Sequence, residues 1–258
     1  MNRTNPVIRK TLAHVASAPA KRPLWQRALA ATLIVSLELA PLKASIDGIL
    51  ELRFGFNAAY AGGPIADPYA PVQFQPKLTH SSTGVPVVNI AAPNAAGMSM
   101  NRYQQFDIDA AGLILNNSLV GGGTLLGGNV AGNTNLNGRA ASLIINEVNS
   151  GAFASQLNGS LEVFGAPAHV IIANPNGINC TGCAFVNAPR LTLTTGAVEF
   201  LSASNGSLTA FANATALAFD VTSGHVTVDG IGIEGTTGRK DIVAQTMTIE
   251  AALRVSNR

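Results

Sequence analysis

The feature that most constrains the fold is a series of short apolar runs separated by turn signals. Past residue 62, no segment carries a sustained apolar period of 3.6 residues with helix caps. Most runs end at a pair such as Asn-Gly, Thr-Gly or Ser-Gly, which is typical of β-strands followed by turns. We therefore predict an all-β fold made of many short strands. The runs are 113–115, 143–145, 161–163, 170–172, 191–193, 208–210, 226–228, 231–233 and 247–249.

The spacing of these runs favours a parallel β-helix over a β-sandwich. Runs centred near positions 171, 192, 209, 227 and 248 are separated by 21, 17, 18 and 21 residues. A recurrence near that length suits coils that stack equivalent strands on one another. A sandwich more often has turn signals roughly every 8–12 residues, and it stays open as an alternative. Two further runs, 184–186 and 198–200, are predicted to form a second sheet of each coil.

The composition agrees with stacked coils. The chain holds 26 Gly and 22 Asn, and its charged residues make up 12%, about half of the usual share near 25%. Small residues let coils stack closely. Asparagine side chains can bond amides along a stack or form turns, and we expect both. The proline-rich stretch 68–86 predicts an extended arm that leads into a first capping strand.

The N-terminal segment has the organisation of a long signal peptide, which we assign to residues 1–61. This segment carries a net charge of +5, whereas residues 62–258 carry −3. Its apolar stretch, 28–42, is shorter than the roughly 20 residues that a membrane-spanning helix needs. Two small-residue sites compete, with cleavage after Ala61 or after Ala44. A mildly acidic body argues against a nucleic-acid partner, because such binding requires clustered basic residues.

Two cysteines, Cys180 and Cys183, stand three positions apart. Export places them in an oxidising compartment, so a disulfide across a tight turn is the favoured interpretation. A thioredoxin-like centre would need a βαβ setting, which the sequence lacks. Zinc would need two further ligands, and His80, His169 and His225 are too scattered to supply them. Two free thiols are the remaining alternative.

No catalytic constellation is evident. The sequence contains no G-x-S-x-G, H-E-x-x-H or P-loop string. Asp107 and Asp109 would share one face of a strand, where paired carboxylates can do acid–base chemistry or bind Ca²⁺. We interpret them instead as solvated residues before a turn. We therefore predict no enzyme activity, no metal, no cofactor and no small-molecule substrate.

One string is specific enough to suggest a family. The apolar run 170–173 leads directly into Asn174-Pro175-Asn176-Gly177-Ile178, where the proline fixes φ and the glycine permits a positive φ. This region resembles the N-terminal secretion domain of the filamentous haemagglutinin/haemolysin exoproteins, whose NPNGI motif is intact here. The second family motif, NPNL, corresponds to 133–136, where Thr134 replaces proline. Further similar segments are 101–106, 112–118, 138–148, 189–196 and 241–244.

The resemblance implies a right-handed parallel β-helix with an N-terminal β cap. It also implies export through the Sec machinery and the periplasm of a Gram-negative bacterium, followed by two-partner secretion to the medium or cell surface. The partner would be an outer-membrane transporter with periplasmic POTRA domains. The positions carried over as needed for secretion are Asn135, Leu136 and Asn174–Ile178, namely Asn174, Pro175, Asn176, Gly177 and Ile178. An alternative stays open, in which both motifs are structural turns that only stabilise the cap.

The C-x-x-C string after NPNGI is similar to that of the haemolysin and contact-inhibition branch. We expect residues 62–258 to be the secretion domain, truncated before any stalk or effector region. Two alternative functions remain. The chain could be a short, self-sufficient adhesin that binds a receptor on host or neighbouring cells, or a secreted β-helix enzyme that degrades polysaccharides.

Overall fold

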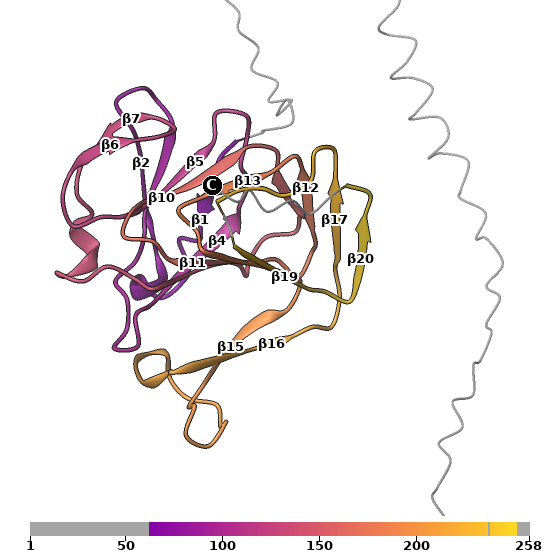
Figure 1. Ribbon diagram of the computed structural model, residues 1–258. Helices are drawn as coiled ribbons and strands as arrows, with labels where there is room; N and C mark the ends of the chain where they lie inside the picture. The colour runs from indigo at the N-terminus through magenta and orange to yellow at the C-terminus, as the bar shows by residue number, and fades with distance from the viewer. Residues whose placement is uncertain (1–61, 237, 252–258) are drawn as a thin grey trace, which may run out of the picture. The chain divides into compact units, whose positions relative to one another are not determined.

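Three β-sheets surround one apolar interior in the computed structural model, which describes residues 62–236 and 238–251 (Figure 1). The predicted signal peptide, with both candidate cleavage sites, lies outside the described residues. Sheet A contains, in spatial order, β1 (Ile65–Ala66), β4 (Met98–Gln105), β8 (Leu143–Val148), β11 (His169–Ala173), β14 (Arg190–Thr194) and β19 (Arg239–Val243). Sheet B contains β2 (Lys77–His80), β3 (Pro86–Asn89), β5 (Leu113–Asn117), β10 (Ser160–Gly165), β13 (Ala184–Val186) and β18 (Glu234–Gly235). Sheet C contains β9 (Ser155–Leu157), β12 (Ile178–Thr181), β17 (His225–Asp229) and β20 (Thr246–Ile249).

The chain visits sheets B, A and C in turn, so each circuit forms one coil of a parallel β-helix. Strands β10, β11 and β12 form one coil, and β13, β14 and β17 form the next. The pairing of Ile171 with Thr192 and of Thr227 with Thr248 spans 21 residues in each case. The prediction of an all-β parallel β-helix is thus confirmed, and the sandwich alternative is wrong because the stacked strands run parallel.

Antiparallel strands cap the first coil in two of the three sheets. Strand β1 pairs with β4, and β2 pairs with β3. The stretch 68–86 is therefore not one extended arm, because it contains the 3₁₀-helix η1 (Val72–Phe74) and strand β2. Sheet C has no such cap among the described residues. Its first strand, β9, is met only by an isolated bridge between Ile108 and Leu157.

Two insertions leave the coils and cover the outer faces of sheets B and A. The first contains β6 (Gly122–Thr124), β7 (Gly128–Val130) and η2 (Thr134–Leu136). The second contains β15 (Ala197–Leu201), η3 (Phe211–Asn213) and β16 (Ala216–Asp220), and its hairpin stands apart from the coils in Figure 1.

The second insertion corrects two predicted runs. Residues 198–200 belong to β15, which pairs antiparallel with β16, and residues 208–210 lie in the loop after β15 rather than in a coil. Their apolar side chains serve a different surface. Val198 and its neighbours pack on Met100, Ile145 and Ile171, which form the outer face of sheet A.

A buried carboxylate fixes this hairpin to the helix. Glu147 accepts a hydrogen bond from the backbone N–H of Val198 at 2.9 Å and pairs with Arg102 at 3.0 Å. The guanidinium of Arg102 in turn lies 5.0 Å from the centre of the Phe74 ring. The carboxylate is 3% exposed and is paired and hydrogen-bonded, as a buried charge must be.

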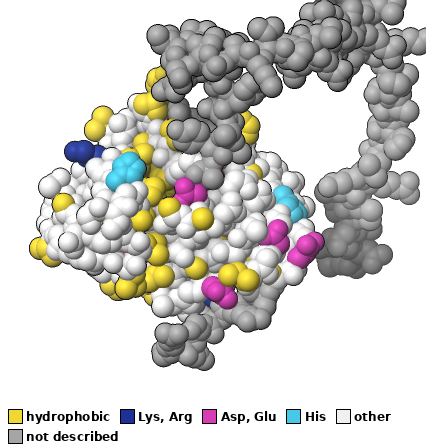
Figure 2. Space-filling model, turned by 90° about the horizontal axis from the view of Figure 1, so that it is seen from above, with side chains coloured by type: hydrophobic (Ala, Val, Ile, Leu, Met, Phe, Trp, Pro, Cys, Tyr) yellow, Lys and Arg dark blue, Asp and Glu magenta, His cyan; other side chains and the backbone are white. Residues whose placement is uncertain are grey.

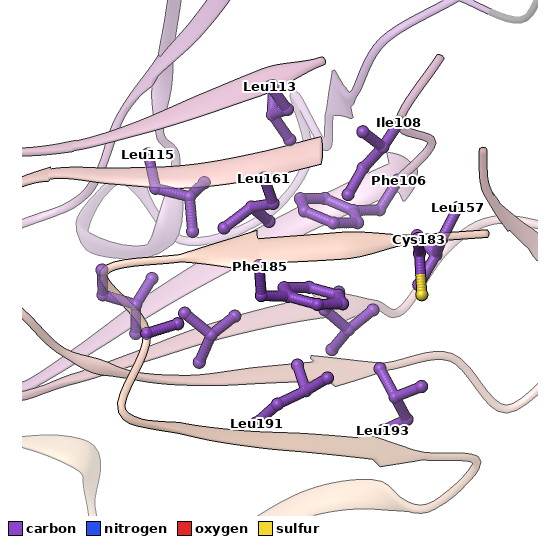
Figure 3. Close-up of a cluster of buried hydrophobic side chains, with 14 of the residues drawn as sticks. Phe106, Ile108, Leu113, Leu115, Leu157, Leu161, Cys183, Phe185, Leu191 and Leu193 are labelled. Atoms are coloured by element: carbon purple, nitrogen blue, oxygen red, sulfur yellow. The ribbon is translucent and has the colours of Figure 1, made fainter. Parts of the chain in front are cut away.

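The interior is apolar on every side. In Figure 3, Leu161 and Phe185 from sheet B point toward Leu191 and Leu193 of β14. Because insertions cover the outer faces of sheets A and B, central strands such as β5 and β8 are buried almost throughout. Sheet C keeps an alternating pattern of buried and less buried residues, as in β17.

Charged side chains are few on the face shown in Figure 2. In the described part of the chain, no helix is long and apolar enough to cross a membrane.

Buried asparagines link successive coils of sheet A. The side-chain N–H groups of Asn101 and Asn146 donate to the carbonyls of Ile145 and Ile171, at 3.2 and 3.3 Å. The hydroxyl of Tyr103 donates to Asn146 Oδ1 at 3.0 Å. The expected asparagine ladder is therefore present beside the asparagine turns described below.

Stability should depend on pH through His169, which lies on the outer face of sheet A with Nε2 3.0 Å from Thr192 Oγ1. Burial, followed by the charge of Arg190, lowers the pKa of His169 from 6.5 to about 4. The unfolded chain therefore binds a proton that the folded chain resists, and stability should fall as pH drops from about 6.5 to about 4. In His169→Gln this loss should be smaller by on the order of 1 kcal/mol, since solvent access to the half-buried ring weakens the effect. Urea unfolding midpoints of both proteins, measured across this pH range, test the prediction. If the midpoints of the two proteins fall equally as the pH drops, His169 is not the cause.

Candidate functional site

The string Asn174–Ile178 forms the corner where β11 of sheet A turns into β12 of sheet C. The backbone N–H of Gly177 donates to the carbonyl of Asn174 at 3.0 Å, which closes the turn. The side-chain oxygen of Asn174 accepts from the backbone N–H of Asn176 at 2.9 Å. An Asx turn therefore lies inside the backbone turn, as the residue types predict.

The same asparagines also bond the preceding coil. The Nδ2 group of the fully buried Asn174 donates to the carbonyl of Phe153 at 2.9 Å and to Ser155 Oγ at 3.0 Å. Asn176 is exposed, yet its Nδ2 group donates to the carbonyl of Gly151 at 3.0 Å. This corner therefore holds two coils together, and its first asparagine makes the buried part of the connection.

The last two positions of the string are buried between coils. Gly177 has a φ of +120°, and a Cβ there would lie 2.9 Å from the carbonyl oxygen of His225 in the following coil. Ile178 is fully buried and opens β12, where it pairs with Ser155 and Val226. A side chain at position 177 would thus meet both backbone strain and a steric clash.

The second string, 133–136, forms a similar turn at a different corner. The side-chain oxygen of Asn133 accepts from the backbone N–H of Asn135 at 3.0 Å, and the N–H of Leu136 donates to the carbonyl of Asn133 at 3.3 Å. The Nδ2 group of Asn133 donates to the carbonyls of Ile90 and Asn116, at 2.9 Å each. This is the bonding pattern of Asn174 in the other turn.

This likeness identifies a residue that the sequence prediction did not select. Asn135 donates to the carbonyls of Asn89 and Ile90, at 3.2 and 3.4 Å, and Leu136 is buried in the main core. The central connection, however, is made by Asn133, which is 3% exposed. The signal that could have found it is the Asn-x-Asn spacing that both strings share.

The two turns are not brought together. The first bonds residues 151–155 in the coil before it, whereas the second bonds residues 89–90 and 116 at the beginning of sheet B. Within the described ranges, no hydrogen bond joins one turn to the other. They therefore act as separate corners rather than as one composite site.

The structure also explains how Thr134 is accommodated in place of proline. Its side chain is exposed, and its backbone N–H donates to no acceptor in the described residues. The preceding residue, Asn133, has φ −81° and ψ 105°, an extended conformation that is compatible with a following proline. The side-chain bond from Asn133 therefore forms the turn without the preset φ that proline would supply.

Cys180 and Cys183 form a disulfide at the corner between β12 and β13. Both are fully buried in the main core, and the Cys183 side chain lies beside Leu157 in Figure 3. Gly182 lies between them with a φ of +73°, which an L side chain rarely adopts. The bridge thus closes a tight turn and fills the interior at the same place.

Asp107 and Asp109 do not form a pair. Asp107 is 5% exposed, so its interpretation as a solvated residue is wrong, because its carboxylate accepts bonds from Gln156 N and Gln105 Nε2. Burial raises the pKa of Asp107. Asp109 accepts from the backbone N–H of Ala111 at 2.9 Å, which is ordinary turn chemistry. Across 62–236 and 238–251, no three His, Cys, Asp or Glu side chains gather closely enough to hold a metal ion.

Comparison with known proteins places these corners in a family context. The family model described as TPS secretion domain matches residues 63–258. The chain is 49% identical over 158 residues to a protein named tRNA nuclease CdiA from Yersinia mollaretii, which covers 61% of this chain and 5% of that protein. It is 39% identical over 182 residues to filamentous hemagglutinin from Bordetella pertussis, covering 70% of this chain and again 5% of the relative. The chain thus spans about one twentieth of the length of these relatives.

A solved structure agrees with the sequence comparison. The crystal structure of a filamentous hemagglutinin secretion domain matches with a TM-score of 0.61 and 36% identity, over 75% of this chain and 60% of that one. Together with the family match, this likeness confirms the predicted resemblance.

The two asparagines of the first turn should differ in their effect on stability. Asn174→Ala leaves the buried Ser155 Oγ without its donor and also removes the bonds to the carbonyl of Phe153 and the N–H of Asn176, so it should cost about 3 kcal/mol. Asn176→Ala removes bonds that water can replace and should cost about 1 kcal/mol or less. Urea unfolding of both variants measures the difference. Equal losses would contradict a buried role for Asn174.

Restoring proline in the second turn should stabilise the protein. Thr134→Pro removes no hydrogen bond, and the residue before it is already extended. The substitution should therefore raise the free energy of unfolding by about 0.5 to 1 kcal/mol, chiefly because the unfolded chain becomes stiffer. Denaturant midpoints of the two proteins test this. A lower midpoint in the variant would mean that the N–H of Thr134 has a partner in solution.

Proposed function

This chain belongs to the family of TPS secretion domains, and we propose that it engages the outer-membrane transporter of a two-partner secretion system. Proteins with this domain are secreted or displayed at the cell surface. The observation that carries the proposal is the match of residues 63–258, which includes the β-helix, its cap and both asparagine corners. A transporter is accordingly the partner that the family implies.

The finer steps of export are part of the same proposal. Residues 1–61 direct the chain to the Sec machinery and are removed, and residues 62–258 cross the periplasm as the secretion domain. The POTRA domains of the transporter receive the chain there. The charge difference between the two parts, +5 against −3, supports this division. A receptor on host or neighbouring cells would be a later partner of the exported protein.

We further propose that the motif residues act in secretion by stabilising the folded coils. This role covers Asn135, Leu136 and 174–178. The support is their burial and bonding: Leu136, Asn174 and Ile178 are buried, and the amide of Asn135 is already bonded to the backbone of the first coil. Such side chains have little surface left for a partner once the coil has formed. The disulfide between Cys180 and Cys183 adds to the same corner region.

The names of the relatives do not extend to catalysis by this chain. The nuclease named among them is matched over 5% of its length, and the match lies in the region that the secretion-domain model covers. We therefore assign the chain a role in export and interaction. The adhesin and polysaccharide-degrading alternatives gain no supporting observation.

Secretion should require the transporter, and the secreted amount should fall with the stability of the folded domain when the corner at 174–178 is altered. With the cognate transporter gene present, the full chain should reach the culture medium, and without it the chain should stay in the cell. Asn174→Ala should reduce the secreted amount several-fold, whereas Asn176→Ala should reduce it little, in parallel with their losses of stability. Quantitative mass spectrometry of the medium measures both. Loss of secretion in Asn176→Ala at full stability would instead make that exposed residue a recognition site.

A further inference from the structure

The uncapped end of sheet C forms a cavity. Sheets A and B begin with β1 and β2, which pair with β4 and β3, whereas the matching segment of sheet C, around Ile108, bridges Leu157 of β9 and has no described strand on its other side. A cavity of about 850 Å³ lies there. It is lined by the start of β1, the end of β4, the turn 150–154 and Gln156 of β9. Ligand sites commonly have this size.

A buried carboxylate without a cation lines this cavity. Asp107 is 5% exposed, and it is the one titratable side chain among the lining residues. Its oxygens accept from Gln156 N at 2.7 Å and from Gln105 Nε2 at 2.9 and 3.0 Å. In the described part of the chain, no ion pair includes it. A buried charge in this situation is costly unless a counter-charge is supplied.

The chain itself leads toward this carboxylate. Strand β1 pairs antiparallel with β4, and Ile65 lies opposite Gln105. In an antiparallel pair, the residues before Ile65 run alongside those that follow Gln105, and therefore toward Asp107. Gly62 lines the same cavity as Asp107. Gly62 and Gly63 carry no side chains that would obstruct a close approach of the backbone.

We propose that the cavity is an ammonium-binding site that receives the α-ammonium group of Gly62 once the leader has been cut after Ala61. The assignment rests on the proposed export and processing of the chain. Before the cut, the nitrogen of Gly62 is part of an uncharged peptide bond and has one N–H. After the cut, it is a cation with three donors, which can bond Asp107 and the amide oxygens of Gln104 or Gln105. Burial raises the pKa of Asp107, as expected for a carboxylate that awaits a counter-charge.

The pairing would couple processing to stability. The precursor holds a buried carboxylate without a counter-charge, and the processed chain holds an ion pair in the same place. Removal of the leader should therefore stabilise the folded domain. This effect distinguishes the ion pair from a merely structural role of Asp107, because a hydrogen-bonding role toward Gln156 would be the same before and after the cut.

A controlled cut in the full chain tests this without export. Residues 56–61 are replaced by the recognition sequence of a protease that cuts before glycine, so that cleavage leaves Gly62 as the first residue. In the otherwise unaltered protein, the cut should lower the equilibrium constant of unfolding about tenfold, on the scale of a partly buried ion pair. In Asp107→Asn the cut should have no effect. Asp109→Asn, two residues further on, is the matched control and should keep the tenfold change.

The reactivity of the terminal amine gives a second readout. Pairing with Asp107 should raise the pKa of the α-amino group above its usual value of about 7.7 to 8.0 and slow its acylation at pH 7 about tenfold. Asp107→Asn should restore the fast rate, and Asp109→Asn should not. Equal rates, or equal effects of the cut in all three proteins, would overturn the proposal.

Two other results would also overturn it. Stabilisation of the uncut chain by millimolar ethylammonium, together with no effect of the cut, would assign the cavity to an external amine. An exported chain that begins at a residue other than Gly62 would remove the proposed ligand. That result concerns processing alone, so it is distinguishable from a failure of transporter-dependent secretion, which leaves the cut-chain experiment intact.

Discussion

The structure depends on hydrogen bonds that buried asparagine side chains make to the backbone of neighbouring coils. A parallel β-helix turns three times in each coil, and every turn leaves peptide groups that the ladders cannot satisfy. At two corners the solution is the same. Asn133 and Asn174 each hold their own turn with the side-chain oxygen and reach the adjacent coil with the side-chain nitrogen. Along sheet A, Asn101 and Asn146 make similar links. Those from Asn133 to Ile90 and from Asn101 and Asn146 to the next coil are shielded from water, so losing one partner there leaves another unsatisfied.

The two insertions cover sheets A and B but not sheet C, so the outer surfaces of these sheets differ in chemistry. The two insertions bury the outer faces of sheets A and B, and Glu147 pins one of them through Val198. Sheet C is left bare, and polar residues such as Asn179, Thr227 and Thr248 occupy matching positions on its neighbouring strands. The insertions thus enclose the outer apolar faces of sheets A and B, whereas sheet C presents polar side chains at these matching positions.

The sequence allowed the coils to be predicted because their signals are local. Runs such as 170–172 and 191–193 combine apolar strands with turn residues, and their spacing of 21 residues is one coil. The runs 198–200 and 208–210 were misplaced for a physical reason. An apolar strand that covers the outside of a sheet has the same pattern as one that lines the interior. The burial of Asp107 was also missed, because it depends on contact with Gln156 in the next coil, 49 residues further along the chain.

The cap explains why the first coil differs from the others. A coil obtains its corner bonds from its neighbours, so the first coil needs a substitute on its open side. Strands β1 and β2 provide this for sheets A and B. For sheet C, the backbone of Ile108 makes two hydrogen bonds to the edge formed by β9 and Asn158, and side chains add further bonds. Asp107 accepts the backbone N–H of Gln156, and Gln105 donates to the carbonyl of Ala154. A strand would have completed this edge without any charge. The use of a carboxylate instead leaves one buried negative charge at the end of the helix, in the cavity that Gly62 also lines.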